Sequence, residues 1–487
     1  MNATFIALVL LIATTSLAAD RNFPHPDRIR YDGQCVTIDG KDTLIFSGAF
    51  HYFRCPKELW RDRFTKIKAA GFNCVETYVA WNVHEREMPA DVNDFSKIDL
   101  TDLRDWLTMA HDEFGLFTIV RPGPYICAEW AAGGYPMWLT LKKPADTTRD
   151  PWLRSDDPTY LAWSKHWMDA VCPEIARHQI TRREKGKAGT ILVQVENEYD
   201  FLGGLTDEQR ITHLKSLVRA ARAGGIDVPL ITCWSKQVRG SHDPDLREIF
   251  DGANTYPRWN IIQTAQQLEK LKREQPDAPL MIPELQGGWF SQVGGKLSEQ
   301  QDGITPAQAK AITMIALSRG GTILNYYMLF GGTNIGDWAA RGNTTTYDYA
   351  AAIREHGGVG EKYAVVKSIG QMLQEIGPTL ARSNTAACDV HGGASDLEIT
   401  ARQTSDGASF VFFWNRSRDK HGKGNVTLRL NGAEQQIQVA YDLSPFDFKL
   451  LMLPAHAKDT SNARWLPEPA SMPTTRPTVP QPVKILT

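Results

Sequence analysis

The sequence predicts an α/β fold, a (β/α)8 TIM barrel followed by a small all-β domain, and three observations support this prediction. Short apolar strands alternate with amphipathic helices over about 360 residues, as in the βα repeats of a barrel. The apolar, β-branched run that starts at residue 190 is typical of a strand buried on both faces of a parallel sheet. After residue 377, strand patterns follow one another without helices. A doubly wound open sheet remains the alternative, although no Gly-rich dinucleotide-binding turn follows the first strand.

Eight strands are expected in the barrel. Each is a short run rich in β-branched, aliphatic or aromatic residues, bounded by turn-forming residues. The runs lie at residues 43–48, 74–80, 116–120, 190–199, 229–233, 249–256, 279–284 and 322–330. The sixth run contains Asp, Gly and Asn and is therefore the weakest strand pattern of the eight.

Helices are expected between these strands, because apolar residues recur there at helical spacing. The segment 56–70 begins with Pro and is followed by Gly71, and the segment 206–222 has a capping Thr206 and is followed by Gly224. The expected helices lie at residues 56–70, 101–111, 159–179, 206–222, 261–273, 306–318 and 361–376. Together, the strands and helices predict one large domain over residues 20–377.

A small β domain is expected over residues 378–455. Its strand patterns lie at residues 408–414, 425–430, 435–439 and 448–453. Asn431-Gly432 predicts a turn between two of these strands. Residues 456–487 carry repeated Pro with Ser and Thr, which is typical of an extended Pro-rich tail.

The first residues resemble a targeting segment. An apolar run over residues 5–13 is followed by small residues at positions 16 and 18, so a signal peptide is expected over residues 1–18. We therefore expect an exported protein, periplasmic or extracellular. No other stretch is long and apolar enough to span a bilayer. Seven Cys without CxxC spacing give no indication of a zinc site, and their pairing cannot be predicted.

Length and composition limit the possible functions. A chain of 487 residues is too long for one small domain. A net charge of -2 argues against nucleic acid as the main partner. The 14 Trp residues are a high count, and each one either packs in the core or offers a flat surface for ligands such as sugars. The oligomeric state cannot be predicted.

Carboxylates follow two of the expected barrel strands. Glu196 and Glu198 end the fourth strand, and Glu284 ends the seventh. Active sites of such barrels are built at the carboxyl ends of the strands, so acids from two strands can meet there. A pair about 5–5.5 Å apart is the arrangement of retaining glycoside hydrolysis. The alternative is that these acids lie on solvated loops or in ion pairs.

Five motifs together resemble glycoside hydrolase family 35, the β-galactosidase family. They are Gln-Val-Glu-Asn-Glu-Tyr at 194–199, Ser-Gly-Ala-Phe-His-Tyr-Phe-Arg at 47–54, Thr-Tyr-Val-Ala-Trp-Asn-Val-His-Glu at 77–85, Arg-Pro-Gly-Pro-Tyr-Ile-Cys-Ala-Glu-Trp at 121–130 and Met-Leu-Phe-Gly-Gly-Thr-Asn at 328–334. The resemblance runs from about residue 40 to 365. It implies a (β/α)8 barrel, retention of anomeric configuration, and no metal or cofactor, because two carboxyl groups carry the reaction.

The resemblance also implies roles for individual residues. Glu198 corresponds to the general acid/base, Glu284 to the nucleophile and Glu196 to a supporting neighbour. Spacing alone cannot separate Glu196 from Glu198, because both would share one face of a regular strand. The implied substrate-binding residues are Tyr78, Cys127, Ala128, Glu129, Asn197, Tyr327 and Tyr349.

Some of these roles are more specific. Asn197 would hold the sugar 2-hydroxyl, and Glu129 the 4- and 6-hydroxyls. Tyr327 would donate a hydrogen bond to the nucleophile. Tyr347 either lines the same wall or is plain core packing.

The resemblance also has limits. Gln286 stands where the family usually has an aromatic residue, so the leaving group that the enzyme accepts cannot be predicted. The C-terminal part holds one small β module, whereas many relatives carry further β domains. The leading hypothesis is a secreted exo-β-galactosidase acting on terminal β-D-galactose of oligo- or polysaccharides. The alternatives are another retaining β-glycosidase (an exo-β-glucosaminidase or a galactan-specific enzyme), or an inactive sugar-binding protein. The natural substrate and its linkage cannot be predicted.

Overall fold

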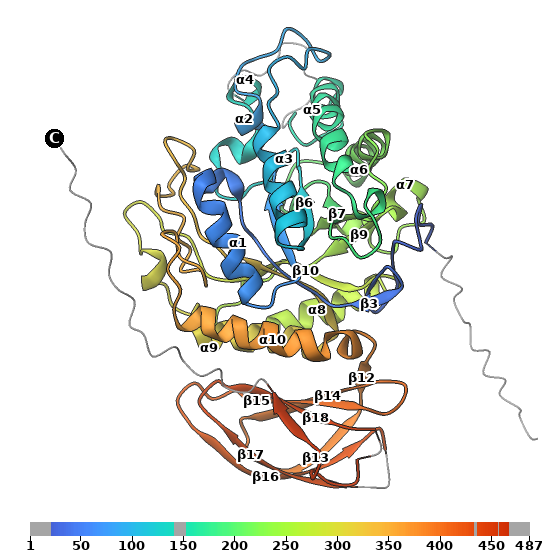
Figure 1. Cartoon of the computed structure of the whole chain (residues 1–487), viewed down its shortest axis with the longest axis vertical. Coiled ribbons are helices and arrows are strands. Elements are labelled where there is room, and N and C mark those ends of the chain that lie inside the picture. The colour runs from blue at the N-terminus through green and yellow to red at the C-terminus, as the bar shows by residue number, and fades with distance from the viewer. Residues whose placement is uncertain (1–20, 141–151, 433–435, 456, 467–487) are drawn as a thin grey trace, which may run out of the picture.

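The computed structural model describes residues 21–140, 152–432, 436–455 and 457–466 (Figure 1). The expected signal peptide and residues 467–487 of the expected tail lie outside the described residues. Within these ranges, no helix combines the length and the apolar character needed to cross a membrane. All seven cysteines are free thiols.

Eight parallel strands form the barrel and confirm the predicted fold. They are β4 (Ile45–Gly48), β5 (Cys74–Tyr78), β6 (Phe117–Arg121), β7 (Thr190–Gln194), β8 (Leu230–Cys233), β9 (Ile249–Gly252), β10 (Leu280–Gln286) and β11 (Gly321–Tyr327). The ladder β5-β6-β7-β8-β9 and the ladder β10-β11-β4 are joined by isolated parallel bridges, Ala49 to Glu76 and Thr255 to Leu285. The ring is thereby closed in chain order, and all eight strands end on the same side.

Helices cover the outside of the barrel. The long ones are α1 (Trp60–Ala69), α3 (Thr101–Thr108), α5 (Pro158–Arg177), α6 (Asp207–Ala223), α8 (Ile262–Glu274), α9 (Pro306–Ser318) and α10 (Glu361–Ala381), and the short ones are α2 (Trp81–His84), α4 (Met137–Thr140) and α7 (Pro244–Arg247). Thr206 caps α6 through a capping box with Gln209. Helix α10 continues through Pro378, five residues beyond the expected helix end at 376.

Several strand predictions near the site were wrong at their ends. Strands β5, β9 and β11 stop two, four and three residues before the expected ends at 80, 256 and 330. Strand β7 stops at Gln194, although the expected strand ran to residue 199. Strand β10 continues to Gln286, two residues beyond the expected end. A short antiparallel sheet of β1 (Ile29–Tyr31), β2 (Val36–Ile38) and β3 (Lys41–Thr43), which the sequence analysis did not predict, precedes the barrel.

The C-terminal part consists of two sheets, β12-β14-β15-β18-β19 and β13-β16-β17. The strands are β12 (Asn384–Ala386), β13 (Cys388–Gly392), β14 (Leu397–Gln403), β15 (Ser409–Asn415), β16 (Gly422–Leu430), β17 (Ile437–Leu443), β18 (Phe448–Leu453) and β19 (Arg464–Leu466). Apolar residues of both sheets form one separate core cluster. Strand β19 lies within the stretch that the sequence analysis assigned to the Pro-rich tail.

A buried arginine attaches this sandwich to the barrel. Arg402 of β14 is 2% exposed and donates to the carbonyl oxygens of Leu317 (2.8 Å), Leu380 (2.9 Å) and Ser383 (2.8 Å). These carbonyls lie at the carboxyl ends of α9 and α10, the two helices between barrel and sandwich (Figure 1). Terminal carbonyls lack partners within their helix and carry partial negative charge, so a cation stabilises them.

Replacement of Arg402 by Met is expected to lower the free energy of unfolding by about 2–4 kcal/mol, because three buried carbonyl groups each lose a hydrogen bond from a charged donor. Urea denaturation followed by circular dichroism measures this change. Arg429→Met is the matched control: Arg429 forms an exposed pair with Asp389, and its loss should cost less than about 1 kcal/mol. Equal stability of the Arg402 variant and the control would contradict the role given to Arg402.

Candidate active site

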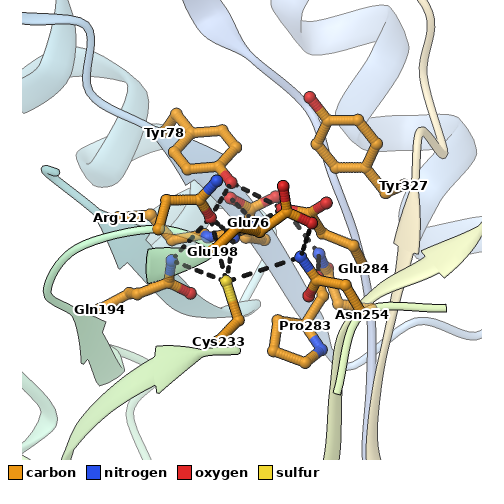
Figure 2. Close-up of polar contacts among 12 residues, drawn as sticks. Glu76, Tyr78, Arg121, Gln194, Glu198, Cys233, Asn254, Pro283, Glu284 and Tyr327 are labelled. Atoms are coloured by element: carbon orange, nitrogen blue, oxygen red, sulfur yellow. Dashed lines mark hydrogen bonds and ion pairs between the residues drawn. The ribbon is translucent and has the colours of Figure 1, made fainter. Parts of the chain in front are cut away.

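Polar side chains gather at the carboxyl ends of the barrel strands. Tyr78 ends β5, Arg121 ends β6, and Glu284 lies near the end of β10. Glu198 and Asn254 follow β7 and β9. Figure 2 shows these five side chains in one cluster, connected by hydrogen bonds. The two acids that the sequence analysis placed after different strands therefore meet at one site.

The carboxylate of Glu284 accepts three hydrogen bonds. Its Oε1 accepts from the Tyr78 hydroxyl and from Arg121 Nη2, each at 2.7 Å, and its Oε2 accepts from the Tyr256 hydroxyl. The side chain is 7% exposed. A cationic donor and two hydroxyls stabilise a negative charge on this carboxylate.

Glu198 has a different environment. Its Oε1 accepts one hydrogen bond, from Asn254 Nδ2 at 2.9 Å. Burial, and after it the negative charge of Glu284, raise the pKa of Glu198 to about 7. A carboxyl group of this kind keeps its proton near neutral pH and can donate it.

Glu196 points away from this cluster, which separates it from Glu198. Both residues have left-handed backbone conformations, with φ of 61° and 47°. The expectation that they share one face of a strand was therefore wrong. Glu196 is fully buried and forms two hydrogen bonds with Arg154, at 2.9 and 2.7 Å. Although burial opposes it, the charge of Arg154 and a hydrogen bond from His213 lower the pKa of Glu196 to about 2.

Asn197 lies between these acids and connects the site. Its Oδ1 is within hydrogen-bond distance of the Tyr78 hydroxyl (2.8 Å), Arg121 Nη2 (2.8 Å), Gln194 Nε2 (3.2 Å) and the Cys233 thiol (3.0 Å). Arg121, Gln194 and Cys233 can donate to this oxygen while the single proton of the Tyr78 hydroxyl is directed at Glu284, so the orientation of the amide is fixed. The amide nitrogen is left to donate to a ligand.

The predicted residues Cys127, Ala128 and Glu129 form one turn of left-handed backbone, with φ of 56°, 54° and 46°. Arg54 Nη2 donates to the Ala128 carbonyl, and its guanidinium lies over the ring of Tyr347. Burial, followed by the charges of Glu129, Glu198 and Glu284, raises the pKa of the Cys127 thiol to about 12. The turn therefore lies within the field of both candidate catalytic acids.

Tyr327, Tyr347 and Tyr349 lie together and form one wall of the site, the tyrosine wall. The Tyr347 hydroxyl donates to Glu129 and lies 3.1 Å from the Tyr327 hydroxyl. The rings of Tyr347 and Tyr327 lie 5.2 and 5.7 Å from that of Tyr349. The expected hydrogen bond from Tyr327 to Glu284 is not among the described contacts, and Tyr256 donates to Glu284 instead.

Gln286 does not occupy the site. Its Oε1 accepts from the backbone amide of Arg258 (2.9 Å) and from Gln308 of α9 (3.3 Å), and it is fully buried. A register shift between Ile282 and Leu285 interrupts the regular alternation of side chains in β10. Its amide therefore fills a polar position behind the strand, beside α9.

Sequence reasoning missed Arg121, Asn254, Tyr256 and Glu76 as members of the site. Glu76 is buried in β5, 3.7 Å from Arg121. Its burial raises its pKa to about 7, despite the opposing charge of Arg121. All four residues lie in or just after a barrel strand, and that position was the signal that could have found them.

Lys362 holds two loops of the site together. It lies at the start of α10, and its Nζ donates to the carbonyl oxygens of Gly287 (2.8 Å) and Ala350 (2.7 Å). Gly287 follows β10, and Ala350 follows Tyr349. Burial, and after it the charge of Arg354, lower the pKa of Lys362 to about 7. Within the described ranges, the site included, His, Cys, Asp and Glu side chains form no group of three suited to a metal ion.

Comparison with known sequences identifies relatives of this chain. The model of glycosyl hydrolases family 35 matches residues 35–373. The β-galactosidase of Bos taurus is 34% identical over 351 residues, which are 69% of this chain and 48% of that protein. The β-galactosidase of Pongo abelii is 34% identical over 379 residues, 76% of this chain and 51% of that protein. The chain spans about half the length of these relatives.

Two solved structures share the barrel fold. The β-galactosidase from the psychrophilic Marinomonas ef1 superposes with a TM-score of 0.50 at 11% identity, over 70% of this chain and 62% of that one. The β-galactosidase from Bacillus circulans sp. alkalophilus gives a TM-score of 0.50 at 13% identity, over 70% and 57%. At these identities the likeness concerns the fold alone.

Proposed function

This chain belongs to glycosyl hydrolases family 35, and we propose that it is an exo-β-galactosidase that removes terminal β-D-galactose with retention of configuration. The observation that carries the mechanism is the pair formed by Glu198 and Glu284. The two acids lie in one cluster, yet their environments differ. Glu284 accepts three hydrogen bonds, whereas Glu198 keeps its proton near neutral pH. The galactose specificity rests on the relatives, and the exo action on the family resemblance.

In the first step, Glu284 attacks the anomeric carbon while Glu198 donates its proton to the leaving oxygen. A covalent glycosyl-enzyme forms, and the leaving group departs as an alcohol. In this intermediate the Glu284 carboxyl is an uncharged ester. The negative charge of Glu284, which helps to raise the pKa of Glu198, is therefore absent. Glu198 can then accept a proton from water, which attacks the anomeric carbon and releases Glu284.

The remaining site residues are proposed to hold the sugar. The free amide nitrogen of Asn197 would donate to the 2-hydroxyl, a contact that strengthens in the transition state. Glu129, fixed by the Tyr347 hydroxyl, would accept from the 4- and 6-hydroxyls. Tyr78 and the tyrosine wall complete the set, together with Cys127 and Ala128. The wall consists of Tyr327, Tyr347 and Tyr349.

Substrate choice is tested with chromogenic glycosides. We expect release of 4-nitrophenol from the β-galactoside and at least about tenfold lower kcat/KM on the β-glucosaminide. The glucosaminide has an equatorial 4-hydroxyl and an amino group in place of the 2-hydroxyl, and both changes leave buried polar groups of the site unpaired. Faster cleavage of the glucosaminide would assign the enzyme to another β-glycosidase activity. Digestion of a galactan then tests exo action: only free galactose should appear, and larger oligosaccharides would contradict it.

The pH profile tests the role of Glu198. Its pKa is raised to about 7, and the acid must be protonated, so kcat/KM for an alkyl β-galactoside should fall tenfold per pH unit above about pH 7. Asn254→Ala should move this decline to higher pH, because the hydrogen bond from Asn254 favours the ionised form. A profile that stays flat to about pH 9 would show that another group is the acid.

Export is proposed on the sequence pattern alone. The apolar run of residues 5–13 and the small residues after it support a cleaved signal peptide. N-terminal sequencing of the protein recovered outside the cytoplasm tests this. The expected mature chain begins at about residue 19 or 20.

A further inference from the structure

Two aromatic side chains next to Glu198 have no part in the mechanism above. Phe201 ends the short 3-10 helix η6 (Tyr199–Phe201), and 71% of its surface is exposed. Trp234 directly follows β8 and is half-buried. Their ring centroids lie 6.1 Å apart, with an angle of 62° between the planes. A single exposed apolar residue is ordinary on a protein surface, so exposure alone does not indicate a binding role. The location of Phe201 relative to the site is the relevant evidence.

The position of this pair is fixed relative to Glu198. The Phe201 amide donates to the Glu198 carbonyl (3.1 Å), and the Asp200 amide donates to the Trp234 carbonyl (2.8 Å). Trp234 Nε1 donates to the carbonyl of Asn254 (3.2 Å), whose side chain in turn donates to Glu198. The backbone segments that carry the two rings are therefore hydrogen-bonded to the segment that carries the candidate acid.

The chemistry defines what lies on this side of the site. A general acid protonates the oxygen that leaves, so the leaving group must lie beside Glu198. Of the groups proposed to hold galactose, Glu129 and the tyrosine wall lie on other strands and loops, and Asn197 directly precedes Glu198 in the loop after β7. The apolar faces of sugar rings pack well on aromatic side chains, which offer a large, rigid surface.

We propose that Phe201, supported by Trp234, is a platform for the leaving group and that its ligand is the sugar ring next to the terminal galactose. This inference rests on the proposed function, because it needs Glu198 as the acid. It assigns the platform to the loop after β7, which makes the acid and the leaving-group site parts of one segment. An enzyme of this kind prefers substrates in which the galactose is linked to a pyranose over those with a small leaving group.

The first test compares two substrates in the full-length enzyme. A β-1,4-linked galactosyl disaccharide offers a sugar leaving group, whereas β-galactosyl fluoride offers fluoride alone. Phe201→Ala should lower the ratio of kcat/KM for the disaccharide to kcat/KM for the fluoride about tenfold, mainly through KM, and Phe201→Tyr should restore it. Phe95→Ala is the matched control, since Phe95 is also exposed (42%) and packs on His166 of α5.

The second test measures transfer of galactose to an added sugar, which would bind to the platform as the acceptor. With galactosyl fluoride as donor, an added glucose molecule can replace water: its hydroxyl attacks the anomeric carbon, Glu198 takes the proton and Glu284 departs. The wild type should form more disaccharide per galactose released than Phe201→Ala does. An equal product ratio in both, together with an unchanged substrate ratio, would overturn the platform.

These outcomes separate the inference from the proposed function. If the wild type releases no galactose from the fluoride, the proposed function is wrong, and the platform is wrong with it. If the wild type cleaves both substrates and Phe201→Ala lowers both equally, Phe201 supports the loop and the platform alone is wrong. A selective loss on the disaccharide, with the Phe95 variant unchanged, supports the platform.

Discussion

Replacement of Glu284 by Ala should lower kcat on every β-galactoside by on the order of 10⁴-fold or more, because the group that attacks the anomeric carbon is removed. Tyr78, Arg121 and Tyr256 all direct their donors at this carboxylate. Steady-state kinetics with 2,4-dinitrophenyl β-galactoside measures the loss. A thermal unfolding curve is the control, because Arg121 loses its nearest counterion in this variant.

Azide makes this test specific for the nucleophile. In Glu284→Ala, azide can enter the space of the lost carboxylate, attack the anomeric carbon and displace the leaving group, which Glu198 protonates. The product is then α-galactosyl azide, with inverted configuration. A β-configured azide from this variant, or wild-type activity without azide, would show that Glu284 is not the nucleophile.

Replacement of Glu198 by Ala should affect substrates according to their leaving groups. An alkyl or sugar leaving group needs a proton, so kcat/KM should fall about 10²–10⁴-fold. Dinitrophenolate leaves without a proton, so its kcat/KM should change little, while the second step slows because water lacks its base. Rapid-mixing kinetics should therefore show a burst of dinitrophenolate followed by slow turnover.

Azide again gives a distinct product in this variant. It attacks the glycosyl-enzyme from the side that Glu198 vacated, displaces Glu284 and yields β-galactosyl azide. Glu196→Ala is the comparison: its buried carboxylate binds Arg154, so this variant should lose stability and should yield no galactosyl azide. A burst and a β-azide product from the Glu196 variant would reverse the assignment.

The barrel could be predicted because alternation of buried strands and amphipathic helices is a repeated, local signal. The separation of Glu196 from Glu198 could not, because it depends on left-handed backbone at both residues and on Arg154, which lies 42 positions away from Glu196. The hydroxyl that donates to Glu284 could not be predicted either, and the family resemblance implied Tyr327. Only the folded chain shows that the Tyr256 hydroxyl reaches the carboxylate.

Other residues of the site carry a signal that can be used. Arg121 and Asn254 are polar residues at or just after the ends of apolar barrel strands, the same pattern that identified Glu284. Gln286 follows the pattern as well, yet its side chain turns to α9, because the register of β10 shifts before it. Position in the chain therefore finds candidates, and strand irregularities decide which of them face the ligand.

Helix α10 has a consequence for how this chain can be divided. Its amino end carries Lys362, which holds the loop after β10, and its carboxyl end is bound by Arg402 of the sandwich. Loss of the sandwich would uncover carbonyl groups at the far end of the helix that supports the site. We therefore expect barrel and sandwich to unfold together, and a replacement of the small domain would have to cover the same carbonyl groups at the ends of α9 and α10.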